Sequence, residues 1–425
     1  MRSGGMRILH TSDWHLGKHL EGFSRLEEQR VFLKELCQIC DEQNIDVVIV
    51  AGDVYDTSNP PAQAEKLYYE ALKDISDSGK RPVFAIAGNH DNPDRIQAAW
   101  PLASEQAILL AGHPKMESYS GPFGNFNIKG LSDNVFELEI RGEKLRLGLL
   151  PYPSERRLNE VLSDSDDETL RQASYSERLG HIFESMDAQF SKEAFNIAVS
   201  HIFVMGGSTT ESERPIQIGG TLVVDPKHLP KNADYIALGH LHRPQPVRKS
   251  EQPAYYAGAP LQYSRSEIGY TKSVSVIEKN GSGEIEITEI PLAMPKPIEV
   301  WRCKGIAEAL EKCEKHKKRS VWVYLEVETD QVLSQSEIKA LKELKPDLLS
   351  IMPILEKQDD IEGESKPEEK GFESLFTEYY EHIRGIKPGD QLQALLGSIL
   401  NDEVDHEADQ TEDQWIEQLY RNTDN

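Results

Sequence analysis

Apolar and polar positions alternate in a regular rhythm over the first third of the chain. Short apolar runs are separated by longer stretches in which apolar residues recur at helical spacing. This pattern is typical of strands and helices that alternate, and it predicts an α/β sheet fold from Met6 to about Leu150. The predicted strands are 7–13, 46–53 and 82–91, and the predicted helices are Arg25–Gln43 and Ala62–Asp77.

Three further strand-like runs follow, at 145–153, 195–201 and 235–242. The stretch Glu155–Phe190 is polar and mostly helical in pattern. Three prolines within Pro291–Pro297 predict a hinge, because proline ends both helices and strands. We therefore expect a first domain over 6–291, with residues 1–5 as an extension outside the fold.

A second pattern begins after the prolines. Apolar runs and helical stretches alternate as β-α-β-α-β, which predicts a small domain of about 60 residues over 298–356. Its predicted strands are 297–303, 320–328 and 348–356, and its predicted helices are Ile306–His316 and Ser334–Leu344.

The last part of the chain has a different composition. Residues 357–371 are charged and poor in apolar side chains, which predicts a flexible linker. Residues 372–400 contain two short amphipathic stretches that favour docking on another protein, with packing onto the chain's own first domain as the alternative. Residues 401–425 form an acidic tail that we expect to be mostly mobile.

Composition bounds the protein class. Apolar residues make up 38% of the chain and charged residues 28%, with no apolar run near the roughly 18 residues of a membrane span. We expect a soluble, cytoplasmic protein without a membrane partner. Four cysteines do not indicate a disulfide framework, and the Cys37–Cys40 pair lies within a predicted helix without a second ligand pair, so we predict ordinary helix residues.

The net charge is −25, which taken alone argues against nucleic acid as a partner. From Lys357 onward there are 19 acidic and 6 basic residues, so about half of the excess lies in the last part of the chain. In the part of the chain before Lys357, bound divalent cations would change the local electrostatic field. The overall charge therefore does not identify the substrate.

Five short polar motifs follow apolar runs: SDWH, GDVYD, GNHD, SH and GHLH. Their carboxylate, amide and imidazole groups suit borderline divalent ions such as Mn²⁺, Fe²⁺, Co²⁺ or Zn²⁺. In an extended backbone, alternate residues such as Asp13 and His15 would lie on one side. The predicted metal ligands are Asp13, His15, Asp53, Asn89, His201, His240 and His242.

This ligand set predicts a metal-dependent phosphoesterase. Two ions need a shared anionic bridge, which we assign to Asp53, and they would activate a water for in-line attack. His90 is predicted to protonate the leaving group, with Asp91 or another carboxylate orienting its ring. We expect seven histidines without a partner in any motif to be surface or packing residues: His19, His113, His181, His228, His316, His382 and His406.

The five motifs in this order resemble the signature of the calcineurin-like metallophosphoesterase superfamily. Within it, SDWHLGK, AGDVYDTSNPPA, IAGNHDNPDR and ALGHLHRPQ are similar to the SbcD family of bacterial nuclease subunits. The resemblance implies an α/β fold, a metallophosphoesterase β-sandwich flanked by helices, with a small α+β DNA-capping domain and a helical C-terminal tail.

The resemblance also implies an activity and partners. The implied activity is that of a Mn²⁺-dependent DNA nuclease, which acts as a double-strand 3′–5′ exonuclease and a single-strand or hairpin endonuclease in DNA repair and recombination. The implied partner is an SbcC-type ABC ATPase bound through 372–400, with a homodimer inside a heterotetramer at the nucleoid. Asp13, His15, Asp53 and His242 would hold one ion, and Asp53, Asn89, His201 and His240 the other, with His90 as the catalytic residue.

One position departs from the archaeal and eukaryotic counterparts but agrees with the bacterial pattern. Archaeal and eukaryotic relatives have a second catalytic histidine shortly after the bridging aspartate, where this chain has Asp56. Two alternatives stay open: a phosphodiesterase or phosphatase acting on nucleotides or phosphoproteins, and a non-catalytic scaffold that binds DNA ends. Basic residues near the motifs are candidates for phosphate contacts: Lys18, Arg25, Arg95, Arg243 and Arg265.

Overall fold

The computed structural model describes residues 5–160, 168–213, 222–280, 283–329 and 333–355, together with Thr377. The chain divides into a unit that ends at Leu355 and a second unit from Glu356. The predicted linker (357–371), partner-binding helices (372–400) and acidic tail (401–425) therefore lie outside the described residues, apart from Thr377.

Two sheets form the centre of the first unit. The first has six strands in the order β18-β17-β1-β4-β5-β6; β1, β4, β5 and β6 are parallel, and β17 runs antiparallel to β1. Its strands are β1 Arg7–Thr11, β4 Val47–Ala51, β5 Val83–Ile86, β6 Ile108–Ala111, β17 Ser273–Lys279 and β18 Ile285–Pro291.

The second sheet has eight strands in the order β15-β16-β14-β11-β10-β9-β8-β7. Its central strands β10, β11, β14 and β16 are parallel, and the remaining ladders are antiparallel. The strands are β7 Gly121–Phe123, β8 Phe126–Ser132, β9 Val135–Ile140, β10 Glu143–Leu150, β11 Ala194–His201, β14 Tyr235–Gly239, β15 Gln245–Pro246 and β16 Ala254–Tyr256.

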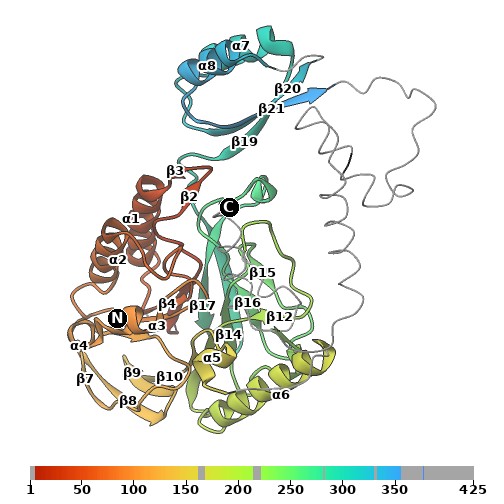
Figure 1. The fold of residues 1–425 in the computed structure, drawn as a ribbon. Coiled ribbons are helices and arrows are strands. Elements are labelled where there is room, and N and C mark those ends of the chain that lie inside the picture. The colour runs from red at the N-terminus through yellow and green to blue at the C-terminus, as the bar shows by residue number, and fades with distance from the viewer. Residues whose placement is uncertain are drawn as a thin grey trace, which may run out of the picture. The chain divides into compact units, whose positions relative to one another are not determined.

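Helices cover the outer face of each sheet (Figure 1). On β4, Val48 and Val50 pack in the core with α1 and α2, whereas Val47 and Ile49 pack in the core between the sheets. All five β4 residues are buried because both faces are covered. The flanking helices are α1 Leu26–Glu42 and α2 Ala62–Ile75 on the first sheet and α6 Glu168–Asp187 on the second.

Shorter elements connect these layers. They are β2 His19–Leu20, β3 Phe23–Ser24, α3 Pro93–Gln97, α4 Trp100–Ala103, α5 Glu155–Leu158, β12 Phe203–Val204 and β13 Val223–Val224. Single 3₁₀ turns occur at Ser104–Gln106, Pro226–His228 and Arg265–Glu267. The predicted β-sandwich flanked by helices is thus confirmed.

The β-α-β-α-β order predicted after the prolines is also present. All three strands run parallel, in the order β19-β20-β21, so both helices are crossover connections and this part is α/β and not α+β. It has its own apolar core around Cys313, Val323 and Leu341. The elements are β19 Ile298–Lys304, α7 Gly305–Lys315, β20 Trp322–Thr329, α8 Gln335–Leu344 and β21 Leu348–Leu355.

Specific contacts join this small part to the sandwich. The indole N–H of Trp322 donates to Glu28 on α1 at 3.0 Å, and the Ile298 N–H donates to Gln262 Oε1 at 2.9 Å. Leu20 packs with these apolar side chains in a separate small cluster. Of the predicted hinge residues, Pro291 ends β18 and the others form the connection to β19.

The cysteines and the apolar content of the helices bear on two predictions made from composition. Cys37 and Cys40 lie in α1, and all four cysteines are free thiols. Burial raises the pKa of Cys37 to about 11 and that of Cys40 to about 12, which makes both thiols poor metal ligands. Among the described residues, no helix has the length and apolar content needed to cross a membrane.

Candidate metal centre

The predicted ligands converge where strands from both sheets end. Asp13 and Asp53 follow β1 and β4, which are parallel neighbours in the six-stranded sheet. His201 ends β11, and His240 follows β14, its parallel neighbour in the eight-stranded sheet. Carboxyl ends of parallel strands lie at one edge of a sheet, so the two edges together bring the motifs to one place.

Glycines in the motifs allow this close approach. A Cβ atom at Gly52 would lie 2.3 Å from His201 Nδ1, and one at Gly88 would lie 2.1 Å from Asp53 Oδ1. At Gly239 it would lie 1.8 Å from the Ala51 carbonyl oxygen. Each motif glycine therefore leaves space for a ligand or for the strand beside it.

The sequence pattern predicted an extended backbone at the ligand residues, but four of them have positive φ. Asp13, His15 and Asp53 have φ of 54°, 47° and 48°, and His240 has φ of 107°. Such values are uncommon for residues other than glycine and cluster at functional sites. The convergence of Asp13 with His15 thus depends on left-handed turns after β1, and the explanation by strand alternation is wrong.

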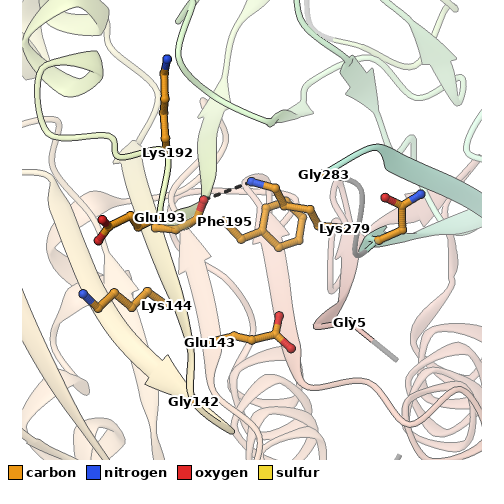
Figure 2. Close-up of a pocket in the computed structure, with 11 residues that line it drawn as sticks. Gly5, Gly142, Glu143, Lys144, Lys192, Glu193, Phe195, Lys279 and Gly283 are labelled. Atoms are coloured by element: carbon orange, nitrogen blue, oxygen red, sulfur yellow. Dashed lines mark hydrogen bonds between the residues drawn. The ribbon is translucent and has the colours of Figure 1, made fainter. Parts of the chain in front are cut away.

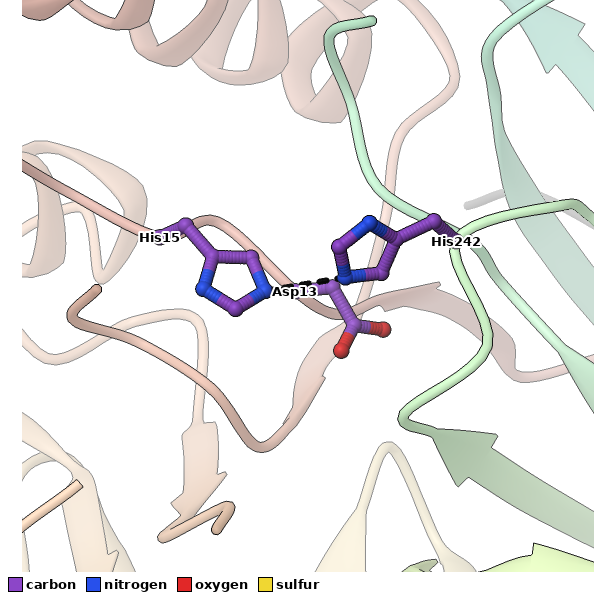
Figure 3. Close-up of side chains that lie close together, drawn as sticks. All are labelled: Asp13, His15 and His242. Carbon is purple, nitrogen blue, oxygen red and sulfur yellow. Dashed lines mark hydrogen bonds between the residues drawn. The ribbon is translucent and has the colours of Figure 1, made fainter. Parts of the chain in front are cut away.

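Three groups of side chains among the described residues lie close enough together to hold an ion, and two of them consist of predicted ligands alone; the third is His15, Asp56 and His90. Asp13, His15 and His242 form the first ligand group (Figure 3). The Nε2 atoms of His15 and His242 lie 3.0 Å apart. Both oxygens of Asp13 accept the His240 N–H at 3.1 Å, and Oδ2 also accepts the Ser12 hydroxyl at 2.5 Å. All three members of the group are buried.

Asp53, His201 and His240 form the second group. Asn89 completes it: its Oδ1 lies 2.9 Å from His201 Nε2 and 3.2 Å from His240 Nδ1. The Nδ1–H of His201 donates to the Ala51 carbonyl at 2.9 Å, which fixes Nε2 as the nitrogen that faces the cluster.

Asp53 lies between the two groups. Its Oδ2 is 3.7 Å from His15 Nε2 and 3.4 Å from His201 Nε2, while its Oδ1 accepts the His90 N–H at 2.9 Å. One carboxylate oxygen therefore faces ligands of both groups, as a bridging ligand must.

Burial governs the charges in this centre. It raises the pKa of Asp13 to about 6 and lowers the pKa values of His15 and His240 well below their usual range. Burial also opposes ionisation of Asp53, but His201 and His90 outweigh it and hold its pKa well below the usual value. Burial lowers the pKa of His201 as well, but Asp53 outweighs this effect and raises it to about 9. A divalent cation fits this group of buried carboxylates and imidazoles, because it compensates the negative charge that His201 otherwise balances.

His90 lies beside the ligand groups. Its Nε2 is 3.9 Å from Asp53 Oδ2, and its Nδ1–H donates to the Asp56 carbonyl at 2.7 Å. The expected orienting carboxylate, Asp91, instead accepts the backbone N–H groups of Val54, Tyr55 and Gly88 at 2.8–3.0 Å. The ring of His90 is therefore oriented by a backbone carbonyl, and the role predicted for Asp91 is wrong.

Arg25 does not fit the predicted role in phosphate binding. Its side chain is fully buried, pairs with Glu28 at 2.6 Å and donates to the Gln262 carbonyl at 2.6 Å. A guanidinium enclosed in this way has no surface for a phosphate, so Arg25 is a structural residue at the base of α1.

The other predicted basic residues are more accessible. Arg243 is exposed and its guanidinium carbon lies 4.6 Å from the centroid of the Tyr270 ring. Three others already form ion pairs, which a phosphate would have to displace or extend. The pairs are Lys18 with Asp56, Arg95 with Glu65 and Arg265 with Glu326.

Residues outside every motif also contact the centre. Ser212 Oγ lies 2.6 Å from His242 Nδ1, and Glu213 accepts the His242 N–H at 2.8 Å. Glu267 and Lys272 are buried behind Ser212. No motif or periodicity marks these residues, so the sequence offered no signal for them.

A separate cavity of about 730 Å³ lies away from the motifs (Figure 2). It is lined at the amino ends of β10 and β11, whereas His201 is at the carboxyl end of β11. Lysine and glutamate side chains line it in nearly equal number, among them Lys144, Lys192, Glu143 and Glu193. No predicted ligand takes part in this cavity.

Comparison with known proteins agrees with the fold. The family model of calcineurin-like phosphoesterases matches residues 6–244, and the chain belongs to this class. A second model, described as the type 5 capsule protein repressor C-terminal domain, matches residues 294–384.

Two relatives carry the same name, the SbcD subunit of the nuclease SbcCD. The Bacillus subtilis protein is 42% identical over 92% of this chain and 97% of the relative. The Staphylococcus epidermidis protein is 26% identical over 94% of this chain and 100% of the relative. The chain therefore belongs to the SbcD family of nuclease subunits.

A solved structure is also similar in fold. It is a dimetal phosphatase from Danio rerio, and its match covers 68% of this chain and 100% of the phosphatase at 11% identity, with a TM-score of 0.36. This likeness adds nothing to the family assignment.

Proposed function

We propose that this protein is a Mn²⁺-dependent DNA nuclease, the SbcD component of an SbcCD-type complex. One observation carries the proposal: Asp53 Oδ2 faces ligands of two separate groups, 3.7 Å from His15 and 3.4 Å from His201. A carboxylate in this position can bridge two divalent ions, and paired ions are suited to in-line cleavage of phosphodiesters.

The ligands divide between the ions as follows in this proposal. Asp53 is shared, and Asn89 supplies an amide oxygen to the second site. Oxygen and imidazole nitrogen together suit Mn²⁺ better than an all-oxygen Mg²⁺ site. The first ion is held by Asp13, His15, Asp53 and His242, and the second by Asp53, Asn89, His201 and His240.

His90 supplies the proton chemistry. Its Nδ1–H is committed to the Asp56 carbonyl, so the second proton of its imidazolium form would be held on Nε2 and passed from there to the leaving oxygen, which leaves the ring neutral. When bound, divalent ions neutralise the phosphoryl oxygens and lower the pKa of the attacking water. Buried ligand side chains exclude bulk water around this reaction and strengthen its electrostatic interactions.

The names of the relatives support further parts of the proposal. They point to an SbcC-type ATPase as partner, which we assign to residues 372–400, and to DNA as substrate. We assign DNA capping to the parallel β-α-β-α-β part that begins at Ile298. The complex would be a heterotetramer with two copies of this chain, in the bacterial cytoplasm at the nucleoid.

A turnover assay with Mn²⁺ and the ATPase partner tests the function. We expect cleavage of linear duplex and hairpin DNA, and little turnover of cyclic dinucleotides or phosphotyrosine peptides. Preference for the nucleotides or peptides would favour the broader phosphoesterase function. Metal binding and DNA binding without cleavage of any DNA form would favour a scaffold.

A further inference from the structure

Both histidines of the first ligand group turn an outer nitrogen away from the cluster. The Nε2 atoms of His15 and His242 face one another at 3.0 Å, so their Nδ1 atoms point outward. Asp56 Oδ1 lies 3.6 Å from His15 Nδ1, and Glu267 Oε1 lies 3.8 Å from His242 Nδ1. Each outer nitrogen thus has a carboxylate nearby but beyond direct hydrogen-bonding distance, and His15 Nδ1 has no hydrogen-bond partner among the described residues.

Ser212 connects the second of these pairs. Its Oγ lies 2.6 Å from His242 Nδ1 and donates to Glu267 Oε1 at 2.6 Å. Since a hydroxyl has one hydrogen and here gives it to the carboxylate, its lone pair is left to accept from His242 Nδ1–H. The result is a directed chain from imidazole to hydroxyl to carboxylate.

A lysine holds each carboxylate in place. Lys18 Nζ lies 2.8 Å from Asp56 Oδ1. Lys272 pairs with Glu267 Oε2 and also donates to the His242 carbonyl at 3.0 Å. Glu267 and Lys272 are both fully buried, where an ionised side chain persists only with a partner.

The second ligand group is built differently. His201 directs its outer N–H to the Ala51 carbonyl, which is a dipole and carries no net charge. The outer nitrogen of His201 therefore faces a neutral carbonyl, whereas the outer nitrogen of each histidine in the first group lies near a carboxylate. The two halves of the centre differ in their supporting groups even though their ligand types are similar.

We propose that Asp56 and Glu267, the latter through Ser212, are positioning residues that favour metal binding at the first site over the second. This inference rests on the proposed two-metal function. Through the Ser212 hydroxyl, Glu267 keeps the proton on His242 Nδ1, orients the ring and makes Nε2 a stronger donor to the ion. Asp56 lies 3.6 Å from His15 Nδ1 and acts on that ring by its negative charge alone. The inference also gives Asp56 a role at the position where the archaeal and eukaryotic counterparts have a second catalytic histidine.

Mn²⁺ titration calorimetry and electron paramagnetic resonance on the full chain test the inference. For Ser212→Ala and for Asp56→Asn we expect the affinity of one ion to fall about 10–100-fold, with the other within about twofold of wild type. Ser212→Thr, which keeps the hydroxyl, should restore the affinity. The melting temperature without metal should fall only slightly in both variants, because Glu267 keeps Lys272 as its partner after Ser212→Ala and the Asp56–Lys18 pair is partly exposed.

Matched controls come from a similar pair outside the centre. Asp94 Oδ1 lies 2.7 Å from His113 Nε2, and Ser185 donates to the His181 carbonyl on α6. Asp94→Asn and Ser185→Ala should bind both ions as the wild type does. They separate loss of the supporting groups from the general effect of removing a carboxylate or hydroxyl.

Several outcomes would overturn the inference, and they differ from failure of the proposed function. Binding of fewer than two ions by wild type would contradict the two-metal function itself. Two ions in wild type with unchanged affinities in both variants would refute the positioning role, as would equal weakening of both ions. Asp56 also groups with His15 and His90, so an additional ion lost in Asp56→Asn would make Asp56 a ligand and remove it from the proposal.

Discussion

Gly52 has a backbone φ of 89° and faces the imidazole ring of His201. Gly142 has nearly the same φ, 85°, but a Cβ atom there would have no neighbour within 4 Å. A side chain at either glycine would therefore be destabilised by the same positive φ. Only at Gly52 would it also collide with a neighbouring residue. This makes them a matched pair for mutation.

We predict that Gly52→Ala destabilises the protein more than Gly142→Ala and weakens Mn²⁺ binding. Gly142→Ala should cost about 1–2 kcal/mol for the left-handed backbone alone. Gly52→Ala adds the displacement of His201, for a further ~1–3 kcal/mol. Urea unfolding and metal titration measure both effects; equal losses in the two variants would show that the contact with His201 does not matter.

We predict that His90→Gln abolishes DNA cleavage while Mn²⁺ content and melting temperature stay near those of wild type. Glutamine can keep a hydrogen bond near the Asp56 carbonyl, but it cannot transfer a proton as imidazole does. His113→Gln, which removes a histidine paired with Asp94 outside the centre, should keep full activity. Undiminished cleavage by His90→Gln would remove His90 from the mechanism.

Some residues of the candidate site could be predicted from the sequence, and others could not. The motif residues were recognisable because metal chemistry restricts the residue types and because each follows an apolar run, and the structure brings all seven predicted ligands together. Glu267 and Lys272 could not be found in this way, since a buried ion pair has no sequence period and depends on which loops meet in space. The burial of Arg25 was hidden for the same reason.

At the scale of elements, the prediction depended on burial. Strands covered on both faces were predicted where their sequence is apolar throughout, as in β4, or mostly apolar, as in β11. β8 and β18 were missed because exposed and half-buried positions dilute their apolar signal. α1 and α2 were predicted to within two residues, since each buries one face of a regular helix.

Trp322 at the start of β20 ties the small parallel sheet to α1. We predict that Trp322→Phe lowers the free energy of unfolding by about 1.5–3 kcal/mol, because the Glu28 carboxylate loses a donor in a buried place. The variant should also be cut faster by proteases within 291–297, where the connection becomes more accessible. Denaturant unfolding and limited proteolysis measure these effects.

Trp301 offers the control for this prediction. Its indole N–H also donates to a glutamate, Glu299 at 2.8 Å, but both residues belong to β19. Trp301→Phe should therefore leave proteolysis of 291–297 unchanged. Equal cleavage in the two variants would mean that the contact with α1 does not restrain the connection.

At the scale of the whole molecule, the proposed function separates hydrolysis from assembly. All predicted ligands and His90 lie between Asp13 and His242. We predict that deleting 370–425 spares hydrolysis of a simple phosphodiester but abolishes co-purification with the ATPase, because the amphipathic stretches of 372–400 are removed. Pull-down with the tagged ATPase tests this, and a complex that persists would place the docking element elsewhere.

The ligand groups draw on both sheets, and the Ala51 carbonyl on one sheet holds His201 on the other. In the growing chain, Asp13 is made long before His242, and β17, which pairs with β1, is made later still. A nascent polypeptide on the ribosome therefore has no complete centre until most of the sandwich has emerged. For an enzyme that cuts DNA, this order of synthesis delays activity until the fold that controls it is present.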